Sequence, residues 1–238
     1  MGVGLGTAAL LVGYNVVTNL RDGKVHWYLA RNAASAVALV VVARRRGLSW
    51  RQLGLAHTDL RAGWRQGRRV AGATAVTVVA AGTVGQRREL GRRVLADRRA
   101  DLGPRQLAFQ TLVRIPLGTA AFEELAFRGV LFGVLSATAG RRAALVGSSA
   151  AFGLWHVGPT LAALRCNDVR EGRARLTAAA VGLTALAGTG FGVLRLSSGH
   201  VVACGLAHWA INAVGLVLAA RSQRPLRMKP RPGRTLAE

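Results

Sequence analysis

Two adjacent glutamates stand out in segment 122–129, FEELAFRG, because the whole chain has only ten acidic residues. Arg128 follows Glu124 by four residues, a spacing that places both side chains on one helical face and allows an ion pair. Glu123 is turned about 100° away on the same helix and is free to face a cavity. A carboxylate partly withdrawn from water is a candidate general base. The segment therefore predicts a structural pair beside a candidate base.

Two histidines lie at helical spacing from a second side chain. His156 follows Phe152 by four residues in FGLWH, and His208 precedes Asn212 by four in HWAIN. His208 and Asn212 then share a face, so both can offer N–H groups to one point. Donors aimed at a developing oxyanion are each worth about 3 kcal/mol in acyl transfer. Taken singly, Phe152 is a core side chain, and either histidine could equally make an interhelical hydrogen bond.

The setting of these residues is predicted to be a lipid bilayer. Mean hydropathy is +0.28, 51% of the residues are hydrophobic and only 18% are charged. Long charge-free runs alternate with short arginine clusters, and runs such as 70–85, 176–194 and 201–220 approach the roughly 20 apolar residues that cross a bilayer as a helix. A charge inside such a helix costs about 2.5–3.5 kcal/mol and usually faces a cavity or a partner. We therefore expect an all-α, polytopic integral membrane helix bundle with functional polar clusters.

About eight transmembrane helices are expected. Glu123, Glu124 and Arg128 then lie at the junction of the fourth and fifth, and residues 1–220 form one membrane-embedded domain. Residues 221–238 are predicted to be a basic, disordered tail. Between the second and third helices, an amphipathic segment with two tryptophans is suited to a membrane interface. The candidate spans are residues 2–20, 28–43, 70–85, 106–122, 127–140, 143–159, 175–194 and 200–220.

The formal charge of +23 also fits a membrane protein better than a nucleic-acid-binding one. Only two of the 33 basic residues are lysine, and the arginines lie at the ends of apolar runs rather than on one periodic face. Such charges contact lipid headgroups and set topology. Their distribution predicts a multi-pass protein of the cell membrane with both termini in the cytoplasm, and no nucleic acid partner. The cysteines Cys166 and Cys204 show no metal-site or disulfide-framework spacing.

The three motifs together resemble the CPBP (CAAX protease and bacteriocin-processing, or Abi) family, which includes type II CAAX prenyl endopeptidases. EELAFR is similar to that family's EExxxR motif, FGLWH to FxxxH and HWAIN to HxxxN, in the same order. The amphipathic RRGLSWRQLGL resembles a segment common upstream in the family. The resemblance covers about residues 104–215 and implies a multi-helix membrane protein.

The resemblance implies a glutamate-dependent intramembrane endopeptidase. Glu123 would act as general base on a water that His156 also holds. His208 and Asn212 would stabilise the oxyanion of the tetrahedral intermediate. Glu124, Arg128 and Phe152 would support the site. No cofactor or metal is implied, and the partner would be a peptide or protein substrate at the membrane, whose identity the sequence does not indicate.

Two other functions remain open. Two histidines and a glutamate could bind the zinc of a membrane metalloprotease, although no HExxH motif is present and the histidines come from separate helices. Alternatively, the polar cluster could only pack helices in a non-catalytic membrane protein with an immunity, transport or scaffold role. Chelator sensitivity separates the two enzymes, and a trapped cleavage product separates both from the non-catalytic protein.

Overall fold

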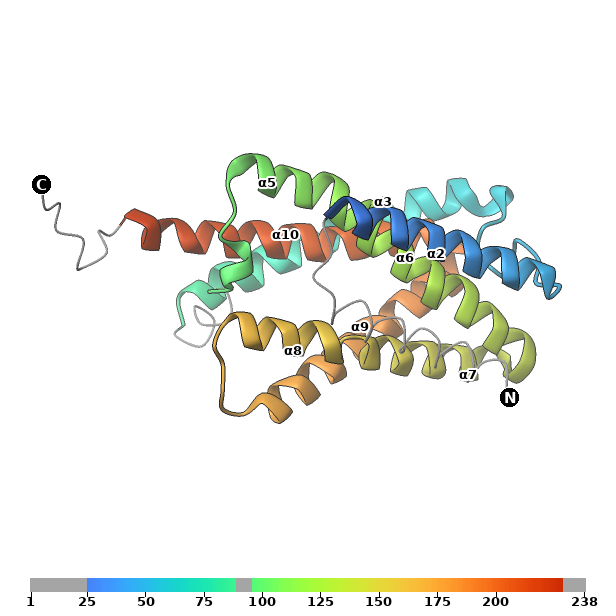
Figure 1. Ribbon diagram of the computed structural model, residues 1–238. Coiled ribbons are helices and arrows are strands. Elements are labelled where there is room, and N and C mark those ends of the chain that lie inside the picture. Colours follow the sequence, from blue (N-terminus) through green and yellow to red (C-terminus); the bar gives the residue numbers. More distant parts are fainter. Residues whose placement is uncertain (1–24, 89–95, 229–238) are drawn as a thin grey trace, which may run out of the picture.

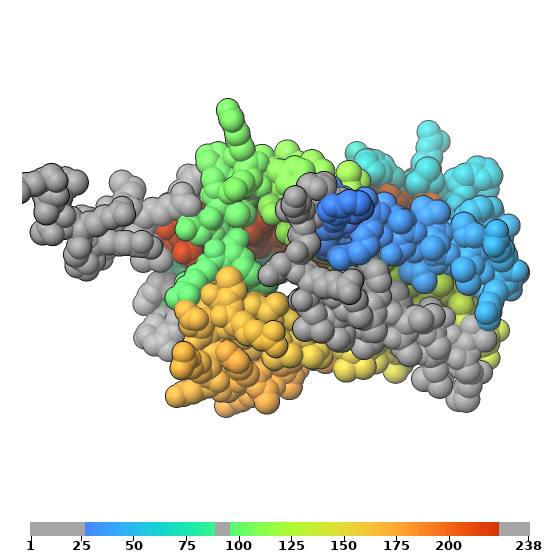
Figure 2. Space-filling view, viewed as in Figure 1, coloured from blue at the N-terminus to red at the C-terminus, as the bar shows by residue number. Residues whose placement is uncertain are grey.

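The computed structural model describes residues 25–88 and 96–228, and this part of the chain is all-helical, without a β-strand. The predicted all-α class is therefore confirmed, while the expected first span, residues 2–20, lies outside the described residues. Figure 1 shows α10 running along the length of the molecule beside α3. From the side shown in Figure 2, only small patches of α10 (red) are visible between its neighbours. The elements are α2 (Val25–Arg45), α3 (His57–Gln86), η1 (Arg98–Ala100), α5 (Pro104–Phe109), η2 (Gln110–Ala120), α6 (Ala121–Glu124), η3 (Leu125–Leu131), α7 (Phe132–Trp155), α8 (Val157–Cys166), α9 (Arg173–Ser198) and α10 (Val201–Met228).

The glutamates lie in the middle of a helix, not at a junction between two. From Pro104 the chain is helical without interruption through α5, η2, α6 and η3 into α7, as far as Gly140, where φ is +86°. The prediction of separate spans at 106–122 and 127–140 is therefore wrong. Hydropathy suggested a break because three charged side chains interrupt the apolar run, but they are buried inside the bundle and need no interface.

This long helix is not α-helical throughout. Both η2 and η3 are π-helical, so their backbone N–H groups bond carbonyls five residues back instead of four. Pro116 lies inside η2, where a proline removes an α-helical hydrogen bond and clashes with the carbonyl four residues before it. The four residues of α6, which carry both glutamates, lie between these two wider segments.

Two of the described helices are long and apolar enough to cross a membrane: α9, and α10 from Val201 to Gln223. Few residues in their most apolar stretches are buried within the protein, 17% and 33%, which favours lipid contact over a soluble core. The predicted count of eight spans is thus not confirmed. The expected span 143–159 is also interrupted, because α7 ends and α8 begins at His156. α10 extends to Met228, past the predicted domain boundary at residue 220.

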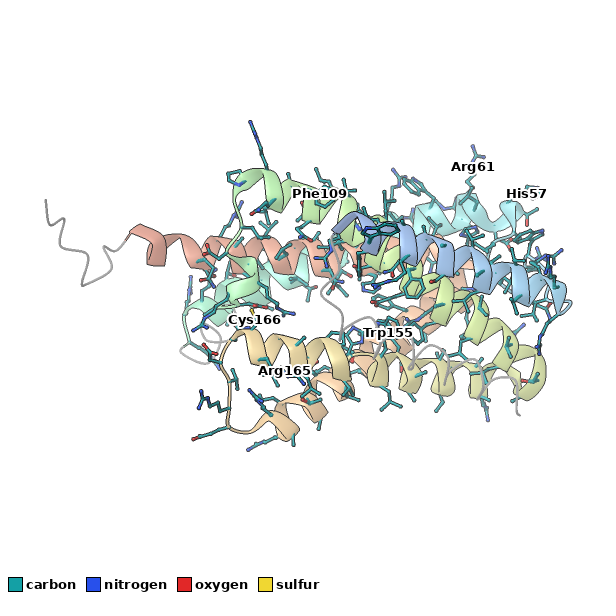
Figure 3. The ribbon with its side chains drawn as sticks, viewed as in Figure 1. His57, Arg61, Phe109, Trp155, Arg165 and Cys166 are labelled. Carbon is teal, nitrogen blue, oxygen red and sulfur yellow. The ribbon has the colours of Figure 1, made fainter. Side chains whose placement is uncertain are left out.

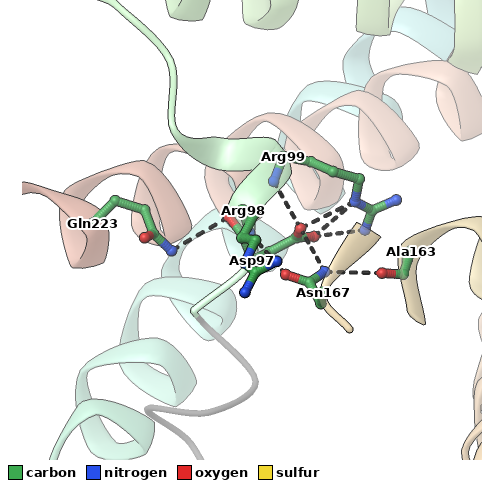
Figure 4. A network of polar contacts seen from close by, with 6 residues as sticks. All are labelled: Asp97, Arg98, Arg99, Ala163, Asn167 and Gln223. Atoms are coloured by element: carbon green, nitrogen blue, oxygen red, sulfur yellow. Dashed lines mark hydrogen bonds and ion pairs between the residues drawn. The ribbon is translucent and has the colours of Figure 1, made fainter. Parts of the chain in front are cut away.

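A polar network fixes the far end of the α8–α9 hairpin (Figure 4). Asp97 accepts hydrogen bonds from the Arg99 guanidinium and, at 3.0 Å, from Asn167 Nδ2 at the end of α8. Gln223 of α10 donates to the Asp97 carbonyl at 3.3 Å. Burial by itself would raise the pKa of the Asp97 carboxyl, but the hydrogen bonds from Arg99 and Asn167 hold that pKa below its ordinary value.

The loop between α2 and α3 closes the opposite end of the bundle. Leu53 is fully buried, and Arg195 of α9 donates to the carbonyls of Arg51 and Gln52 at 2.9 and 3.1 Å. Trp50 and Trp64, which the sequence predicts at a membrane interface, are both 49% exposed. The loop is therefore anchored by one leucine and one buried arginine, with Trp50 on its outside and Trp64 exposed in the first turns of α3.

Candidate active site

The predicted site residues come from three helical segments that meet at the centre of the bundle. Glu123 and Glu124 lie on α6, Arg128 on η3, Phe152 and His156 at the end of α7, and His208 on α10. The four charged or titratable side chains at the centre are almost inaccessible: Glu123 is 7% exposed, Glu124 1%, Arg128 0% and His208 4%. Aromatic side chains enclose them, among them Phe122, Phe127, Phe152, Trp155 and Phe191.

Glu124 contacts two nitrogen-bearing partners, Arg128 and His208. Its Oε1 lies 3.3 Å from Arg128 Nη1, the ion pair that the spacing of four predicts. The same oxygen accepts a hydrogen bond from His208 Nδ1 at 2.8 Å, across to α10. The sequence did not indicate this second contact. Glu124 thus holds the His208 ring in a fixed orientation with Nε2 directed away from it.

Two aromatic rings pack against the Arg128 guanidinium. Its guanidinium carbon lies 4.0 Å from the Phe152 ring centre and 5.2 Å from that of Phe191. Gly188 of α9 leaves room for this arrangement, since a Cβ there would lie 3.0 Å from Arg128 Nη2. Phe152, expected as a packing residue, therefore also supports the cation of the buried pair.

Glu123 points the other way, as the 100° rotation between neighbours predicts. Its Oε1 accepts a hydrogen bond from Trp155 Nε1 at 3.0 Å, and its Oε2 lies 3.8 Å from His208 Nε2. Oε2 is buried and accepts no hydrogen bond from the described residues. One oxygen of this carboxylate is therefore held, and the other is available beside an imidazole.

His156 directly follows Trp155 in the sequence, at the end of α7. Its ring packs edge-on against Phe152 with centres 4.7 Å apart, and Nδ1 lies 2.8 Å from the Phe152 carbonyl. A carbonyl oxygen only accepts, so Nδ1 carries the proton and, in the neutral ring, Nε2 is a free acceptor. Asn212 lies one turn after His208 and is half-buried, without a hydrogen bond to the part of the chain that the structure describes.

Trp155 is the site residue that the sequence analysis missed. It stands inside the motif FGLWH, but an aromatic residue in an apolar run is ordinarily a packing residue, so its type alone gave no signal. Figure 3 places Trp155 near the middle of the bundle, whereas His57 and Arg61 lie at its outer end. Tyr28 and Asn32 of α2 also brace this region, through hydrogen bonds to Thr119 and to the Gly118 carbonyl.

The described residues contain no group of three His, Cys, Asp or Glu side chains arranged to hold a metal ion. No curated protein and no solved structure matches the chain. A family model described as "Type II CAAX prenyl endopeptidase Rce1-like" matches residues 105–214, which include every residue of the site. Over this segment, which carries the buried glutamates and the histidine that faces them, the chain is similar to the Rce1-like type II CAAX prenyl endopeptidases.

Proposed function

We propose that the protein is a membrane endopeptidase that hydrolyses a peptide bond with a water activated by Glu123. The observation that carries the proposal is the environment of Glu123 Oε2, a buried carboxylate oxygen without a hydrogen bond from the described residues, beside a histidine. Buried carboxylate oxygens are normally hydrogen-bonded, and exceptions at a motif-bearing site point to chemistry. Glu124 Oε2 also lacks a hydrogen bond from the described residues, but Glu124 already pairs with Arg128 and His208 through Oε1, which leaves Glu123 as the candidate base. Oε2 is the atom that would take the proton of the water.

His156 supplies a second acceptor for the same water. Its Nδ1–H is held by the Phe152 carbonyl, which leaves Nε2 with a lone pair on the opposite side of the ring. A water that donates one proton to Glu123 and one to His156 would have its oxygen lone pair directed at the substrate. Such positioning contributes as much to the rate as the base itself.

His208 and Asn212 would bind the oxyanion. With Nδ1 donating to Glu124, His208 can offer an Nε2–H only when the ring carries both protons. With both protons on His208, the buried cluster has no net charge, because its two carboxylates face two cations, Arg128 and His208. Neutrality favours this protonation state in a setting of low dielectric. Asn212 adds a neutral amide donor from the next turn of α10, which satisfies the oxyanion without changing that charge count.

The reaction balances with these groups alone. The water oxygen attacks the scissile carbonyl carbon while its proton passes to Glu123 Oε2, and the carbonyl oxygen becomes the oxyanion. When the intermediate collapses, the C–N bond breaks and the proton held by Glu123 passes to the leaving amine. Glu123 then returns to its ionised form, and the products are a carboxylate and a free amine.

The substrate class follows from the family, and we propose a prenylated C-terminal CAAX peptide presented at the membrane. The experiment is cleavage of a farnesylated fluorogenic CAAX peptide by the purified protein in lipid nanodiscs. Glu123→Gln should abolish turnover without unfolding, because the amide keeps the shape of the side chain and loses the base. Glu171→Gln, at an exposed glutamate in the α8–α9 loop, is the matched control and should keep full activity.

Two outcomes would reject the mechanism. Full activity of Glu123→Gln would remove this glutamate as the base. Loss of activity on chelation, restored by zinc, would favour the metalloprotease. If the farnesylated peptide is not cleaved, comparing membrane proteomes of cells with wild-type protein and with Glu123→Gln identifies other substrates. Identical proteomes would favour the non-catalytic role, in which the cluster only packs helices.

A further inference from the structure

The indole N–H of Trp155 donates a hydrogen bond to the Glu123 carboxylate. Packing of an aromatic ring alone does not require such a directed bond. Nε1 lies 3.0 Å from Oε1 in a buried setting. We propose that Trp155 is a positioning residue for the reaction: it binds Oε1 and thereby assigns the role of base to Oε2. The inference rests on the proposed function, because it concerns how the same carboxylate is held.

The Trp155 ring is itself fixed in place. It packs against Phe122 with centres 5.8 Å apart and edge-on against Phe127 at 5.5 Å. Both phenylalanines belong to the helical run that carries Glu123, so donor and acceptor are tied to the same element. A donor with only two rotatable side-chain bonds, clamped by two rings, restrains the carboxylate with little loss of its own freedom.

Trp155 is followed directly by the second residue that the proposed mechanism uses. Trp155 is the last residue of α7, and His156 follows with φ −82° and ψ −1° before α8 starts at Val157. In the proposal, the first residue binds one oxygen of Glu123, and the second presents Nε2 for the water.

The other charged groups around Glu123 cannot replace this donor. His208 approaches from α10, but it faces Oε2 at 3.8 Å. Arg128 is engaged by Glu124 and by two rings. Tyr28 of α2 is close enough to interact electrostatically with Glu123, but its hydroxyl is bonded to Thr119 at 3.0 Å. Without the indole N–H, the carboxylate could rotate and present either oxygen.

The test removes the N–H and keeps an aromatic side chain, which in benzothienylalanine also has nearly the shape of the indole. In Trp155→Phe, and in a protein carrying benzothienylalanine at position 155, the site loses one hydrogen bond to a charged group. Such a bond is worth about 1.5–3 kcal/mol, so kcat on the farnesylated peptide should fall roughly tenfold to a hundredfold. KM should not change, because the indole does not contact the substrate. Trp209→Phe is the matched control, since that half-buried indole donates at 2.7 Å to the Thr111 carbonyl instead.

A second readout needs no turnover. The infrared carboxylate band of Glu123 is identified by its loss in Glu123→Gln, and its frequency reports hydrogen bonding to the two oxygens. The band should shift in Trp155→Phe and in the benzothienylalanine protein, but not in Trp209→Phe. This measurement also decides the case in which the phenylalanine variant unfolds, because benzothienylalanine has nearly the shape of tryptophan.

The outcomes separate the inference from the proposed function. An unshifted band, or unchanged kcat in the Trp155 variants while Glu123→Gln is inactive, would overturn the role of Trp155 and leave the glutamate mechanism standing. An equal loss of kcat in Trp209→Phe would also overturn it, because the effect would then be general to buried indoles. Full activity of Glu123→Gln would reject both.

Discussion

Removal of Arg128 tests whether the buried ion pair stabilises the bundle. Its guanidinium is completely buried, 3.3 Å from Glu124, and lies over the Phe152 and Phe191 rings. Arg128→Ala leaves the Glu124 carboxylate buried with only His208 as counter-ion. Breaking such a pair costs about 3–5 kcal/mol. We expect this loss in the free energy of unfolding, measured by SDS titration of the protein in mixed micelles.

The double variant Glu124→Gln/Arg128→Ala, compared with both single variants, sharpens the test. It removes both charges, so its destabilisation should fall short of the sum of the single variants by about 0.5–3 kcal/mol. Arg65→Ala, at an exposed arginine of α3, is the control and should lie within about 0.5 kcal/mol of wild type. If Arg128→Ala unfolds at the same SDS fraction as this control, the stability assigned to the pair is refuted. Well-folded single variants of both residues that lose all turnover would instead make the pair catalytic.

Three further predictions concern other parts of the structure. Asn212→Ala should lower kcat about 10²–10³-fold on the farnesylated peptide, and far less when Glu123 is already glutamine, because members of one catalytic unit are not additive. Gly54→Ala should lower the free energy of unfolding by more than about 1–2 kcal/mol in SDS titration, since φ is +67° and the new Cβ would overlap the Arg195 guanidinium. Asp97, whose pKa is held below its ordinary value, stabilises the fold fully above that ordinary value and loses this contribution as the pH falls through its folded-state pKa. Thermal melting of Asp97→Asn should therefore depend less on pH in the acid range.

The Gly54 prediction has a control in the chain, and the other two have outcomes that would contradict them. Gly47 has φ +89° with nothing near its would-be Cβ, so Gly47→Ala measures backbone strain alone and should cost less than Gly54→Ala. Fully additive effects of the Asn212 and Glu123 substitutions would place these residues in separate functions. An Asp97→Asn protein that melts with the same acid dependence as wild type would show that other carboxylates govern that range.

The sequence predicted the contacts of the glutamates within their own helix better than it predicted the helices that surround the site. Spacing placed Glu124 beside Arg128 and turned Glu123 away from them, as the structure shows. Periodicity alone could not show that His208 reaches Glu124 from another helix, because that contact depends on how α10 packs. The roles of these residues in catalysis stay predictions.

The spans were harder to predict because hydropathy averages over a window and ignores partners. Three charged residues near position 125 lower the average enough to suggest a junction between two spans. They are instead buried inside a continuous helix, where Glu124 pairs with Arg128. At residue 156 the opposite error occurred: the sequence predicted a continuous helix where the structure has a break. The apolar sequence continues through His156, while the backbone ends one helix and starts another, and residue type alone does not report that change.

The π-helical segments on both sides of α6 determine the direction in which side chains point from the helix that carries Glu123 and Glu124. Each wider turn holds one residue more than an α turn, so the direction of every later side chain depends on where these turns lie. Deleting one residue within Gln110–Ala120 would shorten the helix by only about 1.5 Å but rotate its remaining turns by about 100°. Glu124 would then point roughly where Glu123 points now. Chain length through η2, and not only residue identity, therefore decides which glutamate faces Trp155.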